Sequence, residues 1–333
     1  MKREKRSKWI HVTAPTSDAS NILEKRAQFF EKVRRFFKNR SVLEVDCPAL
    51  CASPSIDAHI DVMEVLLIDG QRAYLHPSPE YGMKRLLCAY GKDIYQMSHV
   101  FRDNENGPLH KPEFTLVEWY RCNMPFSFFI EETLNFIRLF LGKQKAIILT
   151  YREALMRYAR IDPFHASPQE LYSSMQEGLS PEAALWDKET LLQLLFSIHV
   201  EPHLKELTVV IDYPKEQAAL SRVSMKEGIE VAERFEVYYK GIELANGYHE
   251  LADAKEQRAR LCKENEKRIA LGKSSFPLDE GFLHALEQGL PDCCGVAAGF
   301  DRLLMLHLGG ARLEKGIGHA HGHGRGHERE ELF

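Results

Sequence analysis

The sequence predicts an α+β fold in which long antiparallel strands form a sheet and helices gather around it. The first indication is a pair of strand patterns, residues 94–102 and 113–122, separated by a polar loop. The second is a strand pattern over residues 233–251 that is interrupted by Lys240-Gly241, which suits a two-residue turn. Helical patterns occur in groups and do not alternate with single strands, so a parallel sheet built from βαβ units is disfavoured.

The N-terminal third combines an amphipathic helix with short strands. The helix is expected over residues 20–38, with Ser20 or Asn21 as its N-cap. Its predicted apolar face consists of Ile22, Leu23, Ala27, Phe30, Val33 and Phe37. The elements that follow are a strand at 42–46, a strand pair at 60–68 and 72–76 around Asp69-Gly70, and a helix at 79–90.

Three short helices form a predicted insertion at about residues 150–200, between the two groups of strands. Capping boxes pair Thr150 with Glu153 and Ser167 with Glu170, and Asp187 begins the third helix. Elsewhere, a helix is expected at 127–141, a strand at 207–212 and helices at 253–271, 279–288 and 301–307.

The composition is that of a folded protein, because 44% of its 333 residues are hydrophobic and 28% are charged. A net charge of −4 argues against a broad nucleic-acid-binding surface. No apolar run approaches the roughly 20 residues that a membrane span needs, and none follows the basic N-terminus, so neither a membrane segment nor a secretory signal is expected. The seven scattered cysteines fit free thiols in a reducing cytoplasm, and no zinc site is assigned.

The segment from Phe101 to Tyr120 carries the residues that best indicate a function. Arg102 ends the first strand and suits phosphate oxygens. On the returning strand Phe114, Glu118 and Tyr120 share one face because side chains alternate with period two. A nucleotide and an ammonium-bearing substrate could therefore lie side by side on this hairpin.

Two further blocks would have to converge on the hairpin. Glu80 falls in the first turn of its helix, where a carboxylate is favoured by the helix dipole. Glu243 and Glu250 suit magnesium or an ammonium group and are the candidate metal ligands, whereas Asn246-Gly247 is compatible with a simple turn. Arg302 follows the run GVAAG and opens a helix whose N-terminus can face an anion.

This set of residues indicates phosphate chemistry that depends on positioning. Arginines and carboxylates are present, whereas the nucleophile–base sets of hydrolases and the glycine signatures of P-loop and dinucleotide-binding proteins are absent. Nucleotidyl transfer at an α-phosphate requires charge neutralisation and in-line alignment more than it requires a protein base.

The motifs resemble those of class II aminoacyl-tRNA synthetases. FR followed by HKPEFTLVEWY is similar to motif 2, GVAAGFDR is similar to motif 3, and the helix and strand ending at Pro48 are similar to motif 1, the usual dimer element. The segments SPEYGMKRLL and ERFEVYYKGIELANGYHEL narrow the resemblance to the elongation factor P–lysine lysyltransferases, which are paralogues of lysyl-tRNA synthetase. The resemblance predicts a catalytic domain at 20–310, preceded by a tail at 1–19 and followed by a Gly/His-rich tail at 311–333 that is expected to be disordered.

The resemblance implies an ATP-dependent ligase. It would activate (R)-β-lysine with ATP and Mg²⁺ to an adenylate and transfer the β-lysyl group to the ε-amine of a lysine on elongation factor P. It would form a homodimer through residues 20–48. Only about twenty residues precede motif 1, so no OB-fold and no binding of a tRNA anticodon are expected.

The resemblance also assigns roles to individual residues. Arg102 would hold the α-phosphate, while Phe114 would stack on adenine opposite Arg302. The other residues implied at the nucleotide are Asp103, Asn104, Lys111, Glu243 (with Mg²⁺), Leu244 and Gly299. The residues implied at the amino acid are Ser78, Pro79, Glu80, Glu118, Tyr120, Asn246 and Glu250. Ala297 stands where lysyl-tRNA synthetases usually have glycine, and its methyl group would crowd the α-amino group of ordinary lysine.

Two departures from the family pattern lie in the segment that contacts ATP. Asp103 and Asn104 replace the family's Asn-Glu after the arginine, so an accepting carboxylate is lost unless Asn104 or Glu105 substitutes for it. Lys111 replaces the asparagine of HNPEF. Two alternatives therefore remain, a lysine-activating enzyme with another acceptor and an impaired paralogue that only binds its translation partner.

Overall fold

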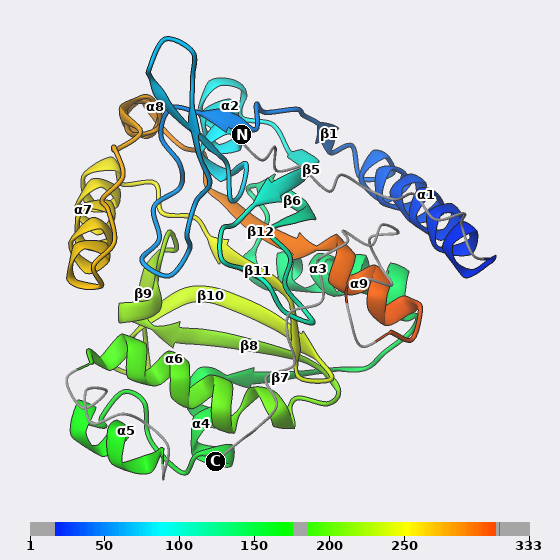
Figure 1. Cartoon of the computed structure of the whole chain (residues 1–333). Coiled ribbons are helices and arrows are strands. Elements are labelled where there is room, and N and C mark those ends of the chain that lie inside the picture. The colour runs from blue at the N-terminus through cyan, green and yellow to red at the C-terminus, as the bar shows by residue number, and fades with distance from the viewer. Residues whose placement is uncertain (1–16, 176–185, 311–312, 314–333) are drawn as a thin grey trace, which may run out of the picture.

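One large sheet organises the molecule, whose computed structural model describes residues 17–175, 186–310 and 313. Among these residues nine strands belong to the sheet, and β9 (Val223–Lys226) pairs only with β10. The other eight follow the order β1 (Leu43–Glu44), β5 (Ile94–Phe101), β6 (Glu113–Cys122), β12 (Cys293–Gly299), β11 (Ile242–His249), β10 (Ile229–Tyr239), β8 (Leu207–Pro214) and β7 (Ala146–Thr150). All neighbours are antiparallel except the edge pairs β1–β5 and β7–β8. The predicted α+β class is confirmed (Figure 1).

The strand at the centre of the sheet was not predicted. β12 inserts between β6 and β11, so the two hairpins recognised in the sequence lie on either side of it. Its sequence, CCGVAAG, consists of small residues that are mostly buried, and it has no alternation of polar and apolar side chains. Such a strand is stabilised by hydrogen bonds to its two neighbouring strands, and its sequence lacks the alternation by which a strand is recognised.

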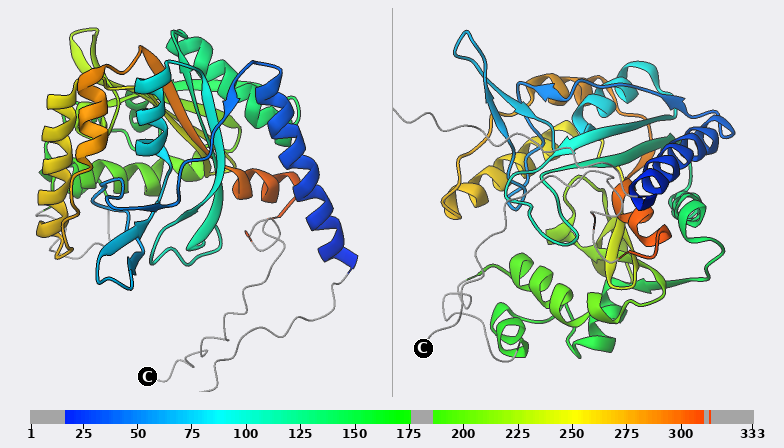
Figure 2. Two further views of the ribbon diagram at one scale, coloured as in Figure 1. Left: turned by 90° about the horizontal axis from the view of Figure 1, so that it is seen from above. Right: turned by 45° about the vertical axis from the view of Figure 1, so that its right-hand side comes forward.

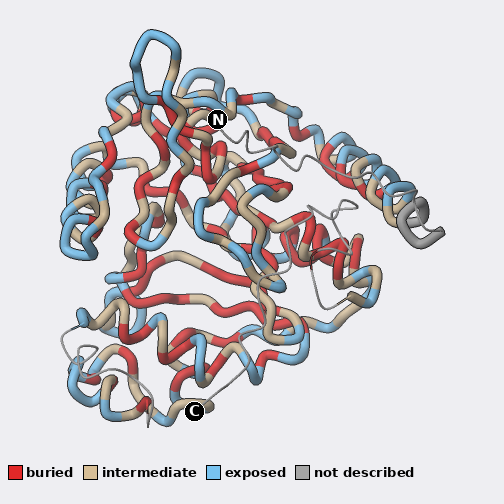
Figure 3. The backbone as a smooth tube through the Cα atoms, viewed as in Figure 1, coloured by how far each residue is buried: buried red, intermediate tan, exposed pale blue. Residues whose placement is uncertain are grey.

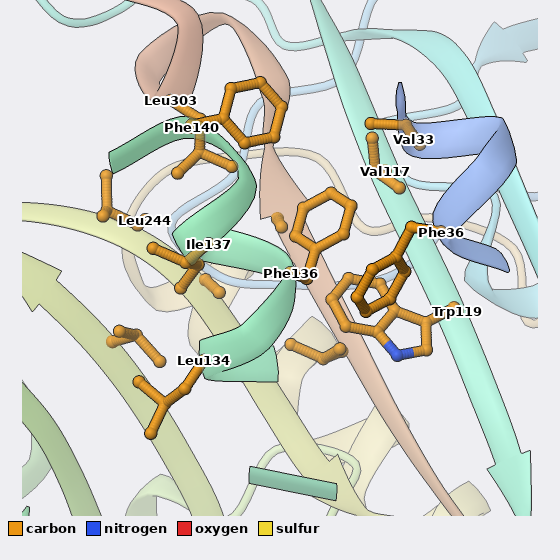
Figure 4. Close-up of a cluster of buried hydrophobic side chains, with 14 of the residues drawn as sticks. Val33, Phe36, Val117, Trp119, Leu134, Phe136, Ile137, Phe140, Leu244 and Leu303 are labelled. Carbon is orange, nitrogen blue, oxygen red and sulfur yellow. The ribbon is translucent and has the colours of Figure 1, made fainter. Parts of the chain in front are cut away.

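Three helices cover the face of the sheet that carries the main hydrophobic core, namely α1 (Ser17–Lys38), α3 (Phe126–Leu141) and α9 (Phe300–His307). Figure 4 shows Trp119 of β6 beside Phe136 of α3 and Phe36 of α1. The predicted face of α1 was partly wrong, because Leu23 and Ala27 are exposed whereas Phe29 and Phe36 are buried. Arg26 of the same helix, which the sequence analysis did not single out, is largely covered and forms an ion pair with Asp301.

The predicted helical insertion is a separate layer with its own hydrophobic cluster. It consists of α4 (Tyr151–Tyr158), α5 (Pro168–Ser174) and α6 (Lys188–His199), which pack against β8 and β10. Both capping boxes form, and Asp187 accepts from the backbone of Thr190. This layer lies at the bottom of Figure 1. Two 3₁₀ turns, at Glu201–His203 and Lys215–Gln217, flank β8.

A third group of helices lies at the opposite end of the molecule (Figures 2 and 3). It comprises α2 (Glu80–Tyr90), α7 (Ala254–Ala270) and α8 (Glu280–Gln288), beside a small sheet of β2 (Leu50–Cys51), β4 (Arg72–Leu75) and β3 (Glu64–Leu66). These segments share a third buried cluster. Across the described residues, every helix is too short or too polar to cross a bilayer.

The terminal segments lie largely outside the described residues, as does the predicted tail at 311–333 except for Leu313. That residue is buried, and its backbone N–H donates to Pro108 O at 2.9 Å. The chain after α9 therefore returns to the loop between β5 and β6 at this point.

Candidate active site

A cavity of about 420 Å³ brings the three predicted blocks together. Most of the predicted site residues line it: Ser78, Glu80, Arg102, Lys111, Phe114, Glu118, Tyr120, Glu243, Leu244, Asn246, Glu250, Gly299 and Arg302, together with Ala297. Three predicted residues, Pro79, Asp103 and Asn104, are not part of the lining. The cavity also extends to α6, where it reaches Glu189 and Gln193, and to Arg260 and Glu264 of α7.

The floor of the cavity is one face of the central strands. Ala297 of β12 lies opposite Glu118 of β6 and Asn246 of β11. Asn246 in turn lies opposite Glu236 of β10. Residues directly opposite on neighbouring strands present their side chains to the same face, so these four residues form one row. A second row, displaced by two residues, contains Tyr120, Gly295, Tyr248 and Arg234.

Gly295 is required by the close packing of this floor. A Cβ atom at this position would lie 2.3 Å from Glu250 Oε1 and 2.3 Å from Tyr120 Cε1. Such distances are not compatible with unshifted neighbours, because real Cβ contacts are essentially never shorter than 3.0 Å. The glycine therefore allows a carboxylate and a phenol to enter the cavity floor side by side.

Glu118 is a buried carboxylate whose hydrogen-bond donors, among the described residues, are neutral. Ser78 Oγ donates to Glu118 Oε2 at 2.6 Å, and Tyr120 Oη donates to Glu118 Oε1 at 2.7 Å. Burial, followed by the nearby charge of Glu80, raises the pKa of Glu118 to about 8. A cationic group placed in the cavity would favour the ionised form of this carboxylate.

Lys84 is a site residue that the sequence analysis missed. Its side chain is fully buried, and its Nζ atom lies 2.7 Å from Glu80 Oε1 and 2.6 Å from Glu250 Oε2. Burial alone would lower the pKa of the Lys84 ammonium, but the two carboxylates raise it above its ordinary value. The spacing of Glu80 and Lys84 was a usable indication, since residues four apart share a helix face.

Phe114 and the two predicted arginines gather at the other end of the cavity. The guanidinium carbon of Arg102 lies 5.1 Å from the ring centroid of Phe114. Arg302 Nη1 donates to the backbone oxygen of Glu243 at 2.9 Å and lies 3.7 Å from Glu243 Oε2. Arg302 Nη2 also lies 2.9 Å from His110 Nε2. Two cations beside an aromatic face suit a polyphosphate attached to a planar base.

A buried network connects this end of the cavity to the first helix. Asp301 Oδ2 accepts from the backbone N–H of Thr115 at 2.6 Å, and Asp301 also pairs with Arg26 of α1. Arg26 Nη2 donates to Thr115 Oγ1 at 2.6 Å. Thr115, which follows Phe114, and Asp301, which precedes Arg302, are thus held together by hydrogen bonds to each other and to Arg26.

The two departures from the family pattern have different placements. Asp103 and Asn104 are exposed, and the backbone N–H of Asp103 donates to Asp61 O at 2.7 Å. Glu105 lines the cavity, and its Oε1 lies 3.7 Å from Arg102 Nη1. Lys111 also lines the cavity. Of the two candidates for the missing acceptor, Glu105 is therefore the one that borders the nucleotide end.

The two candidate metal ligands lie at different places along the cavity. Glu243 belongs to β11, Glu250 directly follows that strand, and seven residues of extended chain span roughly 23 Å. Glu250 is paired with Lys84. Glu243 lies at the nucleotide end, where one carboxylate and phosphate oxygens match the usual ligands of Mg²⁺. Among the described residues, no group of three His, Cys, Asp or Glu side chains could hold a metal by itself.

A second polar cluster at the floor was also missed. Glu236 accepts from Tyr213 Oη at 2.7 Å, and it contacts Tyr238 Oη and Arg234 Nη2 as well. Arg234 Nη1 donates to Gln217 O at 2.9 Å. Because Arg234 and Glu236 neutralise one another, this cluster adds no net charge to the cavity.

Comparisons with known proteins identify the family of the chain. The family model described as tRNA synthetases class II (D, K and N) matches residues 2–317. A protein of Proteus mirabilis named elongation factor P–(R)-β-lysine ligase is 44% identical over 308 residues, which is 90% of this chain and 94% of the relative. Proteins with the same name from Photorhabdus laumondii and Edwardsiella ictaluri are each 43% identical, over 90% and 91% of this chain and 94% and 95% of the relatives.

Proposed function

Because the chain belongs to the class II tRNA synthetase family (D, K and N) and, within it, to the elongation factor P–(R)-β-lysine ligases, we propose that it attaches (R)-β-lysine to elongation factor P at the expense of ATP. In the first step the β-lysine carboxylate attacks the α-phosphorus of ATP, and pyrophosphate leaves. In the second step the ε-amine of an acceptor lysine attacks the carbonyl carbon of the adenylate. An amide forms, AMP leaves, and the amine gives up a proton.

The observation that carries the proposal is the division of the cavity into two ends of opposite character. Phe114, Arg102 and Arg302 provide an aromatic face and two cations for the nucleotide. The other end holds Glu118 and Glu250, whose carboxylates suit ammonium groups. The α-phosphate and the substrate carboxylate would meet between them, which is the alignment that adenylate formation needs.

The chain's own residues would contribute mainly by binding and charge neutralisation. Arg102 would hold the α-phosphate as negative charge moves onto it, and Arg302 would neutralise the leaving pyrophosphate. Glu243 would bind Mg²⁺ together with phosphate oxygens, and the ion would supply further neutralisation of the phosphates. Leu244 and Gly299 would border the nucleotide. Ser78 and Tyr120 would keep Glu118 oriented toward the substrate.

A homodimer is proposed through residues 20–48. Helix α1 and β1 lie along one side of the molecule (Figures 1 and 2), and β1 is an edge strand of the large sheet. Leu23 and Leu43 are exposed there. A second copy that covers this edge would bury these side chains. The Arg26 network would then link the dimer edge to the nucleotide end of the cavity.

The proposed macromolecular partner is elongation factor P. Binding of a tRNA anticodon is not proposed. All strands in the described part of the chain belong to the large sheet or the three-stranded sheet, and none of them forms the separate five-stranded barrel that reads an anticodon. Because translation factors act in the cytoplasm, this compartment is the proposed location of the enzyme.

The direct test is mass spectrometry of elongation factor P after incubation with the protein, ATP and β-lysine. The expected result is a mass increase of one β-lysyl group that requires both small molecules. Adenylate formation without this increase would point to another acceptor, and absence of adenylate formation would favour an impaired paralogue that only binds its partner. The same reactions with α-lysine measure the substrate preference.

Replacement of Ala297 by glycine is expected to improve the use of α-lysine. Ala297 lies between Glu118 and Asn246 on the floor. Its methyl group would occupy space that the α-amino group of ordinary lysine needs. A methyl-sized difference is worth about 1–3 kcal/mol, so kcat/KM for α-lysine should rise by at least about tenfold in pyrophosphate exchange. The value for β-lysine should change much less. An equal change for both substrates would contradict this role of Ala297.

Binding of β-lysine near pH 7 is expected to release protons. The pKa values of Glu118 and Glu250 are raised to about 8 and about 7, in both cases primarily by burial, and substrate ammonium groups would favour their ionised forms. In the free protein these groups bind protons that the unfolded chain, with Glu pKa values near about 4.3, does not bind. Their contribution to stability is therefore present at low pH and is lost as the pH rises to about 8.

Calorimetry in two buffers of different ionisation enthalpy measures this release directly. We expect it to diminish above pH 8, where both carboxylates are already ionised. The Glu118→Gln variant should release fewer protons than the wild-type protein. Equal release by the two proteins would show that Glu118 does not titrate on binding.

A further inference from the structure

Lys84 occupies a position that the reaction itself does not explain. It projects from the first turns of α2 into a fully buried site between Glu80 and Glu250, and it is not part of the cavity lining. Burying an ammonium group is costly unless it is paired. A neutral residue could fill this space at lower cost if only packing were needed. The lysine is therefore expected to have an electrostatic role.

The carboxylates whose charges act on Tyr120, at the amino-acid end of the cavity, are those of Glu118, Glu80 and Glu250, and these can be counted together with Lys84. Glu80, Glu118 and Glu250 all line the cavity, and Tyr120 lies among the three. Lys84 pairs with two of them, whereas the side-chain partners of Glu118 are the hydroxyl groups of Ser78 and Tyr120. With all three carboxylates ionised, three negative charges and one positive charge leave a net charge of −2.

This net charge matches a diamino acid. Once its carboxylate has formed the mixed anhydride with AMP, the β-lysyl group presents two ammonium groups and a charge of +2. A site with charge −3 would retain an uncompensated buried carboxylate, and a site with charge −1 would leave one ammonium group without a counter-charge. Both conditions are unfavourable in a buried cavity.

We propose that Lys84 is a positioning residue that sets the charge of the amino-acid end at −2 by neutralising one of its three glutamates, so that the cavity selects a substrate with two ammonium groups. The inference rests on the proposed function and adds a determinant of specificity that does not touch the substrate. Lys84 also holds Glu80 and Glu250 at a common distance from one ammonium nitrogen, which fixes the separation of their carboxylates.

Charge-altered variants separate this role from simple packing. Glu80→Gln changes the net charge to −1 and Lys84→Met changes it to −3, whereas the Glu80→Gln/Lys84→Met double variant returns it to −2. Each single variant is expected to raise KM for β-lysine by at least about tenfold, because each leaves a buried charge unbalanced. The double variant should have a lower KM than either single variant. KM for ATP should stay within about twofold throughout, since the nucleotide end is unchanged.

Matched controls exclude nonspecific effects of the substitutions. Arg85→Met removes the neighbouring cation of α2, which is partly exposed and pairs with Asp279, and it should leave KM for β-lysine unchanged. The analogue 3-aminohexanoate, which has one ammonium group, should be a poor substrate of the wild-type protein. Glu80→Gln should lower the ratio of kcat/KM for β-lysine to kcat/KM for this analogue. A residue that only supports the fold would not alter this ratio.

Pyrophosphate exchange, together with calorimetric binding of β-lysine in the absence of ATP, provides the measurements. The proposal would be overturned if the increases in KM for β-lysine of the two single variants multiplied in the double variant. It would also be overturned if Lys84→Met left KM for β-lysine unchanged. If Lys84→Met does not fold, Glu80→Gln can still be compared with the double variant. The double variant should bind β-lysine more tightly than Glu80→Gln, because removal of the lysine restores the net charge of −2. Failure of the wild-type protein to activate β-lysine would overturn the proposed function, whereas failure of the rescue alone would overturn only the role of Lys84.

Discussion

The Arg102→Ala variant is expected to lose adenylate formation by about 10³-fold or more while the fold stays intact. A guanidinium group that neutralises a phosphoryl group in the transition state contributes about this much or more to the rate. The structural role of Arg102 is small, because its ion-pair partner Glu105 is 3.7 Å away and its Nε atom has no hydrogen-bond acceptor among the described residues. The loss should therefore appear in the rate and not in the stability.

Pyrophosphate exchange with β-lysine and quenched single-turnover assays measure the effect. Arg102→Lys serves as a graded control, since it keeps the charge but cannot form two parallel hydrogen bonds to a phosphate. Its activity should lie between those of the wild-type protein and the alanine variant. Thermal unfolding should give the same midpoint for all three proteins. Near-normal turnover of Arg102→Ala would show that the hairpin is not the nucleotide site.

The Gly295→Ala variant is expected to lose binding of the amino acid while it retains binding of ATP. The added Cβ atom would lie 2.3 Å from both Glu250 Oε1 and Tyr120 Cε1, and both side chains are buried. Neither can move without disturbing Lys84 or Glu118. A misplacement of about 1 Å can cost about 10²-fold in rate, so kcat/KM for β-lysine should fall by at least this factor. Overpacking should also reduce the free energy of unfolding by about 1–3 kcal/mol.

Gly299→Ala is a matched substitution at the other end of the same strand. Its Cβ atom would lie no closer than 3.7 Å to Arg302, which is an ordinary contact. KM for β-lysine should therefore be unaffected by this change. Separate titrations with ATP and with β-lysine distinguish the two ends of the cavity. Normal β-lysine kinetics of Gly295→Ala would mean that the floor of the cavity is not the amino-acid site.

Local interactions explain why many elements were predictable. The capping box of Thr150 and Glu153 forms as expected, because both partners lie within one turn of the same helix. Lys240 and Gly241 both adopt positive φ, at 55° and 74°, as a two-residue hairpin turn requires. The alternation along β6 likewise placed Phe114, Glu118 and Tyr120 correctly on the cavity face. Each of these features depends on residues that are close together in the sequence.

Features that depend on distant segments were missed. β12 lacks a periodic pattern, and it becomes a strand because β6 and β11 supply its hydrogen-bond partners. The ion pair between Arg26 and Asp301 joins residues of α1 and α9, which are far apart in the sequence. The separation of Glu243 from Glu250 followed from their spacing only once the extent of β11, from Ile242 to His249, was known.

The amino-acid sequence by itself determined the class of fold, the family and the residue types of the two ends of the cavity. These follow from local periodicity and from long motifs that remain recognisable without coordinates. The tertiary structure alone decided which carboxylates are paired and which remain for the substrate. Glu80 and Lys84 could have been an ordinary surface pair on α2, but burial and the approach of Glu250 turn them into a three-charge cluster. Electrostatic balance in a cavity depends on burial and on distant partners, and neither is encoded by the spacing of residues along a helix.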